Sequence, residues 1–529
     1  MSVMRRFNIA GPCHADRHYM IPPERRFGEC PELVDKQAYF VVHAPRQTGK
    51  TTTMKALAGA LTKAGRYAAL HFSCERARAF PDDVAAAERA VWGSIEGAAH
   101  SDLPAALHPP ARVDADAGLF LGAQLARWAK VCPLPLVLVF DEIDALTGNG
   151  LLSVLSQLRA GYNARPAPFP WSVALCGMRD VRDYRAASGG DPVRAGSSSP
   201  FNIKEASLRL GNFTEAEVRE LYSQHTADTG QVFTDEALCR AWALAQGQPW
   251  LSNALAREIV EEMRLPPTEP ITAAHIDEAK ERLILTRATH LDSLLARLRE
   301  EPVRRVLEPI LAGELPHHDP LNEDHRYVTD LGLIAPDPPV RIANPIYREI
   351  IFRVLAGDTE RAVLVDRQSF VGPDGQLEMP RLLDSFAAFW REHGEVLAER
   401  TEYTEVAAQL VFMAFLHRIV NGGGLIDREI GIGKKRIDLL VRWPCTGAGG
   451  QRVVQRVALE LKVWRDRDKK GNPLPQGLVQ LDQYLARLGL DEGVLVLFDL
   501  RSAAPPVEER TRLEQATTPS GRRVTVLRA

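Results

Sequence analysis

The sequence predicts a multidomain α/β protein, and three observations lead to this prediction. A chain of 529 residues is too long for one hydrophobic core, so two to four domains are expected. In residues 1–205, apolar strand-like runs alternate with helical stretches, as in a parallel sheet covered by helices. Beyond residue 380 the order changes to helices followed by three consecutive strand-like segments, which predicts a second α/β domain.

Composition excludes several classes of protein. Hydrophobic residues make up 45% of the chain, charged residues 25%, and the net charge of −3 argues against non-specific coating of nucleic acid. No run approaches the roughly 18–20 apolar residues that a membrane helix needs, and no secretory signal follows the first arginines. Seven cysteines without a CxxC pair are typical of reduced core residues. We therefore expect a cytoplasmic protein without membrane contact.

Residues 38–53, AYFVVHAPRQTGKTTT, form the most informative segment: an apolar strand, a turn, and Lys-Thr at the start of a helix. Backbone N–H groups in such a loop point at a phosphate, and the helix presents its positive end to the same anion. This is a P-loop (Walker A) pattern, which binds ATP or GTP. The expected nucleotide-binding residues are Ala44, Pro45, Arg46, Gln47, Thr48, Gly49, Lys50, Thr51 and Thr52.

Two residues of this loop have expected roles. Lys50 would reach the β- and γ-phosphates, and the Thr51 hydroxyl would hold Mg²⁺. Ala44 stands where the pattern has its first glycine, but it adds only a methyl group, so we expect the loop to form. The alternative is an ordinary strand–turn–helix.

A second motif follows about 90 residues later, in PLVLVFDEIDAL (135–146). This buried strand ends in Asp141 and Glu142, a Walker B pattern. Asp141 would bind the nucleotide's Mg²⁺ through its water shell, and Glu142 would polarise the water that attacks the γ-phosphate.

A third strand, WSVALCGM (171–178), ends in Arg179, the candidate sensor of the γ-phosphate. Arg182 and Arg185 are alternatives as finger or surface arginines, and all three could be solvated loop residues. If they do not complete the site, a finger from a second subunit would be needed, which would imply a homo-oligomer. The turn-rich stretch 186–200 is expected to be a lid or a surface insertion.

From residue 208 the pattern becomes helical, with Thr214 and Thr234 as expected N-caps. Together with the Walker motifs, Asn212-Phe213-Thr214 and Gly247-Gln248-Pro249-Trp250 resemble the archaeal-type and signal-transducing (STAND) ATPases of the AAA-like class over residues 30–260. The resemblance implies a three-layer αβα ATPase domain (1–205) and a helical lid (206–285). It also implies ATP as the nucleotide, and a Gly-x-Pro turn close to that nucleotide.

Residues 286–356 resemble the winged helix that follows the lid in this ATPase group. The expected order is helices, the Gly332 turn, strand LIA, a proline-rich tip, strand VRIAN and a helix. Winged helices often read DNA, but the candidate recognition helix 322–331 is acidic. A relay role between domains is therefore preferred to DNA reading.

After a linker (357–380), residues 381–529 are expected to form a further domain. The segments 425–433, 436–443 and 456–464 are strand-like. Asp438 lies early in the second. Glu460 and Lys462 lie two residues apart in the third, so their side chains point to the same face.

This pattern, IDLL followed by ELK, resembles the PD-(D/E)xK restriction-endonuclease-like fold. The resemblance implies that Asp438 and Glu460 hold Mg²⁺ and that Lys462 positions the attacking water or stabilises the transition state. It further implies a metal-directed acid at Glu405 and a helix glutamine at Gln480, with Gln483 as the alternative.

The expected function combines both motifs. ATP hydrolysis would regulate a Mg²⁺-dependent nuclease, an architecture that resembles prokaryotic defence proteins. Residues 425–472 carry twelve Lys and Arg against six Asp and Glu, which favours a nucleic-acid partner, DNA more than RNA. Because this fold also occurs as an inactive binding module, the alternative is a non-cleaving ATPase switch that binds nucleic acid or a protein.

Overall fold

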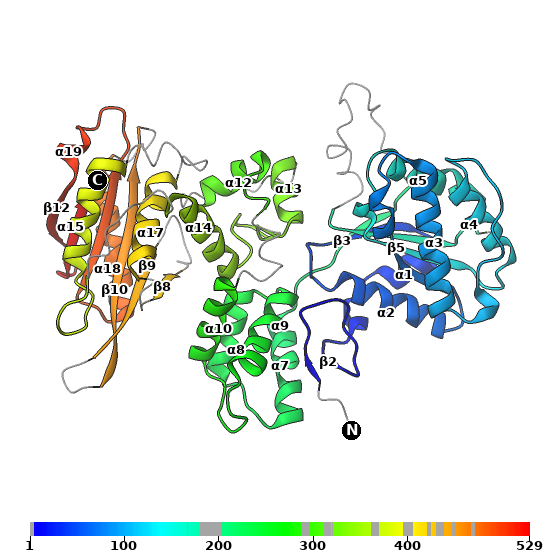
Figure 1. The fold of residues 1–529 in the computed structure, drawn as a ribbon, viewed down its shortest axis with the longest axis horizontal. Coiled ribbons are helices and arrows are strands. Elements are labelled where there is room, and N and C mark those ends of the chain that lie inside the picture. Colours follow the sequence, from blue (N-terminus) through cyan, green and yellow to red (C-terminus); the bar gives the residue numbers. More distant parts are fainter. Residues whose placement is uncertain are drawn as a thin grey trace. The chain divides into compact units, whose positions relative to one another are not determined.

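The computed structural model describes residues 5–166, 168–179, 203–286, 296–311, 319, 321–360, 370–394, 406–420, 425–429, 438–446, 451–466 and 471–529. The chain forms two compact units (Figure 1). Unit 1 contains Met1–His290 and Thr329–Leu333, and unit 2 contains Leu291–Val328 and Ile334–Ala529. The four predicted domain boundaries within these units stay predictions.

Unit 1 is built on a five-stranded sheet whose strands are parallel throughout. Its spatial order is β4 (Ala68–Ser73), β5 (Leu136–Asp141), β6 (Ser172–Gly177), β3 (Tyr39–His43) and β7 (Ala206–Arg209). The strand that carries the P-loop, β3, is thus separated from the strand that carries Asp141, β5, by β6. Carboxyl ends of parallel strands share one edge, so the residues that follow these three strands lie together.

Helices cover both faces of this sheet (Figure 1). On one face, α1 (Cys30–Asp35) and α2 (Lys50–Lys63) pack against side chains such as Val42 and Val139. On the other face lie α3 (Val84–Asp102), α4 (Phe120–Val131) and α5 (Gly148–Gly161). Successive strand residues point to opposite faces of the sheet, and both sets are apolar. Helices therefore pack on each face, which gives the three-layer αβα arrangement.

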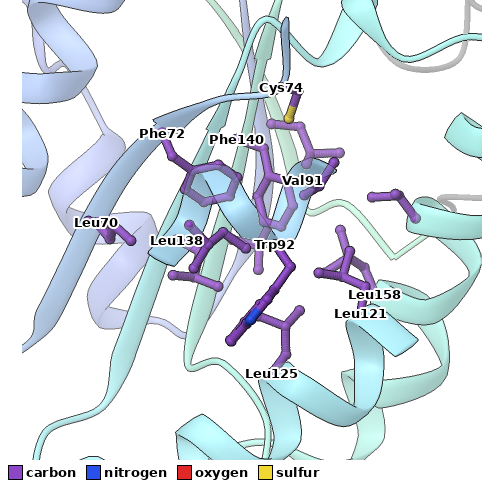
Figure 2. Close-up of a cluster of buried hydrophobic side chains, with 14 of the residues drawn as sticks. Leu70, Phe72, Cys74, Val91, Trp92, Leu121, Leu125, Leu138, Phe140 and Leu158 are labelled. Carbon is purple, nitrogen blue, oxygen red and sulfur yellow. The ribbon is translucent and has the colours of Figure 1, made fainter. Parts of the chain in front are cut away.

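The second of these cores is centred on a tryptophan (Figure 2). Trp92 of α3 is fully buried and lies among leucines of the sheet and helices, with Phe72 and Phe140 nearby. The rings of Phe72 and Phe140 meet edge to face, with centroids 4.6 Å apart. Trp92 also packs edge-on against Trp128 of α4. This core holds β4 and β5, and β5 ends in the predicted acid Asp141, next to Glu142.

Within the described residues of unit 1, four helices follow the sheet, in the region predicted to be a helical lid, and we call them the lid helices: α7 (Glu215–Thr229), α8 (Asp235–Ala245), α9 (Pro249–Arg257) and α10 (Ala273–Leu285). Thr214 caps α7 in a capping box with Glu217, and Thr234 caps α8 through Ala237 N–H. Both N-caps were predicted from the sequence, and both are confirmed. The short parallel strands β1 (Arg6–Phe7) and β2 (His18–Tyr19) also belong to unit 1.

The first described helices of unit 2 are α12 (Glu301–Leu311), α13 (Glu323–Asp330), whose last two residues belong to unit 1, and α14 (Pro345–Glu360). The two predicted strands between α13 and α14 are reduced to one antiparallel bridge, Ile334 to Ile342. Pro336, Pro338 and Pro339 lie between the bridged residues and cannot donate to a ladder, so the pairing does not extend.

The second sheet has six strands in the order β12, β13, β11, β10, β9, β8. Their bounds are β8 (Leu425–Glu429), β9 (Asp438–Thr446), β10 (Arg452–Trp464), β11 (Glu492–Asp499), β12 (Arg512–Thr517) and β13 (Arg523–Arg528). β8, β9 and β10 form an antiparallel meander, while β11 pairs with β10 in parallel after a crossover through α18 (Leu474–Leu488).

Helices cover both faces of this sheet as well. α18 packs on one face through Leu481, Tyr484 and Leu485. On the other face, aromatic residues of α15 (Met379–Phe389) and α17 (Ala407–Val420) gather around Phe498 of β11. α15 passes into a π-helical turn at Trp390–Gly394.

Candidate functional site

The loop between β3 and α2 has the geometry of a phosphate cradle. α2 begins at Lys50, with Gly49 as its N-cap in the left-handed region at φ 84°. The Lys50 ammonium donates to the carbonyls of Ala44 (2.8 Å) and Pro45 (2.7 Å), so it is held inside the loop. Burial lowers the pKa of Lys50. Ala44 is fully buried and the loop forms around it.

Asp141 lies beside Thr51, as a shared Mg²⁺ site requires. The Thr51 hydroxyl donates to Asp141 Oδ2 at 2.7 Å, and His71 Nε2 lies 2.9 Å from the same oxygen. The Glu142 N–H donates to Oδ1. Burial acts to raise the pKa of Asp141, but the hydrogen bonds from His71, Thr51 and Glu142 outweigh it and hold that pKa below its ordinary value.

This pair fits a magnesium ion because both ligands are hard oxygen donors. Asp141 is 2% exposed and ionised, and an alcohol and a carboxylate that already touch need little rearrangement to share an ion. His71 was not predicted from the sequence. The sequence signal for His71 was a histidine within an apolar strand, β4, which pairs with the strand that ends in Asp141.

Glu142 is held in a strained backbone conformation at the mouth of the site. Its φ of 53° and ψ of 42° lie in the left-handed region, which is uncommon for a residue with a side chain. The Ser73 hydroxyl, at the end of β4, donates to Glu142 Oε2 at 2.7 Å. Ser73 therefore fixes the orientation of the carboxylate predicted to polarise the attacking water.

Arg179 follows β6 by two residues, so it lies at the same sheet edge as the P-loop and Asp141. Its role as sensor stays a prediction. Arg182, Arg185 and the loop 186–200 lie outside the described residues.

Beside the P-loop lies a cavity of ≈ 120 Å³, which we call the N-terminal cavity. Its apolar walls include Ile9 and Ile21 of the N-terminal region and Phe213 and Trp250 of the lid region. Gln47 and Gly49 of the P-loop also line it. The cavity therefore adjoins the loop that is predicted to bind phosphates. The sequence analysis missed it.

The N-terminal wall of this cavity is tied to both the lid and α2. Gln224 of α7 exchanges two hydrogen bonds with the backbone of Met20. The indole of Trp250 donates to Ile9 O at 3.0 Å. Cys13 N–H donates to the hydroxyl of Thr52 at 3.1 Å. The residues before the P-loop thus contact both α2 and the helices that follow the sheet.

Arg26 links the P-loop to the start of the lid. Its guanidinium donates to Thr48 O at 2.8 Å and also to Gly211 O, and it lies over the ring of Phe213. Burial lowers the pKa of Arg26 to about 10, so it stays charged at neutral pH.

The Gly-x-Pro turn lies close to the P-loop, as the resemblance implied. Gln248 Nε2 reaches Gln47 O at 3.4 Å, and Pro249 and Trp250 line the N-terminal cavity. Gly247 has a φ of 69°, and a Cβ there would lie 1.9 Å from Phe213 O. Only glycine fits this position.

A short segment, Thr329–Leu333, belongs to unit 1 and contacts the start of the P-loop. His43 Nδ1 lies 3.5 Å from Asp330 Oδ1, and Arg209 donates to Thr329 O at 3.0 Å. Gly332 packs so closely on Pro45 that an added Cβ would lie 2.7 Å from its ring.

Unit 1 therefore has the architecture of a P-loop ATPase domain. No protein-family model matches the chain, and a search of curated proteins finds no match. Among solved structures, a Walker-type ATPase of Pyrococcus abyssi aligns with TM-score 0.46 and 11% identity, over 65% of this chain and 99% of that one. The Holliday junction branch migration motor RuvB of Thermotoga maritima aligns with TM-score 0.34 and 15% identity, over 62% and 95%.

The Orc1 protein of Aeropyrum pernix, solved in complex with DNA, aligns with TM-score 0.31 and 14% identity, over 65% of this chain and 95% of its own. Similarities at this level carry no argument about what this chain does. The assignment of unit 1 rests on its strand order and on the loop that follows β3.

Within the described residues, no helix is long and apolar enough to cross a membrane.

In unit 2, two of the predicted acids occupy directly opposed positions on neighbouring strands. Asp438 of β9 is the direct antiparallel partner of Glu460 of β10, and directly opposed residues project to the same face. Lys462 Nζ lies 2.6 Å from Glu460 Oε1, and Glu460 is 1% exposed. The Asp438 side chain lies outside what the structure describes.

α18 packs on the face of the sheet that carries Glu460 and Lys462. An added Cβ at Gly477 would lie 3.4 Å from Lys462 Cγ, so the first turns of α18 lie on the face that carries Lys462 and Glu460. Gln480, one turn further along the same side, is 7% exposed. Glu405 lies outside the described residues, and Gln483 lies on α18 next to the buried stripe.

No group of three or more His, Cys, Asp or Glu side chains within the described ranges is placed to hold a metal ion. The side chains of Asp438 and Glu405 fall outside that search.

Proposed function

We propose that this protein binds ATP with Mg²⁺, hydrolyses it in unit 1, and uses the nucleotide state to regulate a Mg²⁺-dependent nuclease-like domain in unit 2. The observation that carries the ATPase half is the 2.7 Å contact between Thr51 and Asp141, with Glu142 next to it. A cavity that fits a nucleobase adjoins the same loop.

Each residue of the site has a task in this proposal. The P-loop amides and Lys50 bind the β- and γ-phosphates. Thr51 and Asp141 would hold Mg²⁺, which supplies charge neutralisation for the transferred phosphoryl group. Glu142, oriented by Ser73, positions and polarises the attacking water. Arg179 senses the γ-phosphate, unless a second copy of the chain supplies the arginine.

ATP binding tests this half. Wild-type protein should bind ATP in the presence of Mg²⁺ in a calorimetric titration, and Lys50→Ala should weaken binding at least tenfold. Lys55→Ala is the matched control, because Lys55 lies on the same helix and pairs with Asp102 at the surface. If Lys50→Ala and Lys55→Ala bind ATP equally well, the P-loop assignment is wrong.

The segment 329–333 supports a coupling role. It begins with the last two residues of α13, and its Gly332 packs on Pro45, the second residue of the phosphate loop. A change in the loop on binding or loss of phosphate would therefore press on Gly332 or release it. This would carry the nucleotide state into the chain that leads to α14, in line with a relay rather than a DNA-reading module.

The nuclease half rests on the cross-strand pair of Asp438 and Glu460, with Lys462 beside it. In this proposal Asp438, Glu460 and Glu405 hold Mg²⁺, Lys462 stabilises charge at phosphorus, and Gln480 positions the phosphate. The basic stretch 425–472 would attract the backbone of DNA. A role in prokaryotic defence is part of the same proposal.

Plasmid cleavage tests this half. Supercoiled DNA is incubated with Mg²⁺ and wild-type, Glu460→Ala or Lys462→Ala protein, with and without ATP. Glu492→Ala is the control, since Glu492 is an exposed acid on the neighbouring strand β11. Wild type and Glu492→Ala should cleave, the other two should not, and ATP should alter the rate. Absence of cleavage under conditions of ATP hydrolysis would favour a non-cleaving switch.

A further inference from the structure

We propose that Asn253 reads the exocyclic amine of adenine and so selects ATP over nucleotides with a keto group at that position. This inference rests on the proposed ATP site and names the group that distinguishes the base. Asn253 belongs to α9 of the lid, lines the N-terminal cavity and is 6% exposed.

The amide of Asn253 has its nitrogen bound within α9 and its oxygen without a hydrogen-bond partner among the described residues. Its Nδ2 donates to Pro249 O at 2.8 Å. A carbonyl can only accept, so this bond fixes which end of the amide is nitrogen. Oδ1 is buried and has no hydrogen-bond partner among the described residues. A buried acceptor without a partner destabilises the protein unless a ligand supplies a donor.

The position of the cavity identifies the donor. Gln47, Gly49 and Thr52 line the same cavity, so a nucleotide whose phosphates lie in the P-loop would place its base there. The apolar side chains of Ile21, Phe213 and others form walls that suit a planar ring. Adenine carries an amine that donates two hydrogen bonds, whereas hypoxanthine and guanine carry a carbonyl at the same position.

A keto group would place two acceptors opposite each other in a buried site. Because Nδ2 is held by Pro249, the amide cannot rotate to offer a donor without breaking that bond. The lost bond and the unpaired acceptor together are expected to weaken binding of a keto base by about 10- to 100-fold.

Calorimetric titration with ATP, ITP and tripolyphosphate tests the inference. ITP differs from ATP by the keto group, and tripolyphosphate contacts only the phosphate loop. We expect wild type to prefer ATP over ITP by about 10- to 100-fold, and Asn253→Leu to reduce this ratio to about threefold or less, with tripolyphosphate binding unchanged. Asn212→Ala is the control, since Asn212 also donates to a backbone carbonyl near the lid but lies on the surface.

Failure of this inference can be told apart from failure of the proposed ATP site. If wild type binds neither ATP nor tripolyphosphate, the ATP site itself is wrong. If wild type binds ATP and ITP equally, or Asn253→Leu keeps the full preference, Asn253 does not read the base. Asn253→Ala is a second variant, to be measured in case Asn253→Leu does not fold. Loss of tripolyphosphate binding in both variants would also overturn the inference.

Discussion

Replacement of Gly247 by alanine should open the helical lid. Gly247 lies in the turn between α8 and α9, its φ is 69°, and its carbonyl accepts from Phe213 N–H at 2.8 Å. An added Cβ would lie 1.9 Å from Phe213 O and 2.7 Å from the ring of Trp242. Phe213 O is a backbone atom, so it cannot rotate out of contact with the added Cβ.

The magnitude follows from two contributions. A left-handed backbone costs a residue with a Cβ about 1–2 kcal/mol. Overpacking against fixed atoms adds about 1–3 kcal/mol. We therefore expect Gly247→Ala to destabilise the packing of the lid helices by about 2–5 kcal/mol, which corresponds to about 30- to 4000-fold faster local opening.

Hydrogen–deuterium exchange of the full chain measures this opening. Peptides from α8 and α9 should exchange faster in Gly247→Ala by the stated factor. Gly230→Ala is the matched control, because Gly230 caps α7 at φ 79° with no atom within 4 Å of an added Cβ. It should show the strain contribution alone, about tenfold. Equal exchange in the two variants would refute the overlap at Phe213.

Three further outcomes are expected. Trp92→Ala, which empties the centre of the core in Figure 2, should lower the free energy of unfolding by about 3–5 kcal/mol in urea denaturation, whereas the exposed Leu119→Ala should change it little. Thr214→Ala removes a capping box and should cost about 1 kcal/mol in the same assay; no change would mean that the cap does not form. Arg26→Ala removes the guanidinium that joins Thr48 to Gly211 and should weaken ATP binding about tenfold by calorimetry, and unchanged affinity would contradict that role.

The sequence was sufficient for features that depend on local pattern. The P-loop, the strand ending in Asp141, and the caps Thr214 and Thr234 each need only a few neighbouring residues to define them. Asp438 and Glu460 could be placed on neighbouring strands because the three segments follow one another. Their pairing as direct opposites required the register of the sheet.

Other features depend on residues far apart in the chain. Ile9 meets Trp250, and Met20 meets Gln224, across more than 200 residues, so no local pattern could predict the N-terminal cavity. His71 lies beside Asp141 because β4 pairs in parallel with β5, and this pairing is not visible in the local sequence. The short strand β7 and the strand β12 were missed because the alternation of apolar and polar residues in them is weak.

Hydrolysis in a single turnover tests the central claim most directly. Full-length protein in excess over radiolabelled ATP and Mg²⁺ should release phosphate, while Glu142→Gln should bind ATP with similar affinity and release it about 10²- to 10⁴-fold more slowly. Equal rates in the two proteins, or no release by the wild type when ATP is bound, would contradict the assignment of unit 1 as a hydrolysing site.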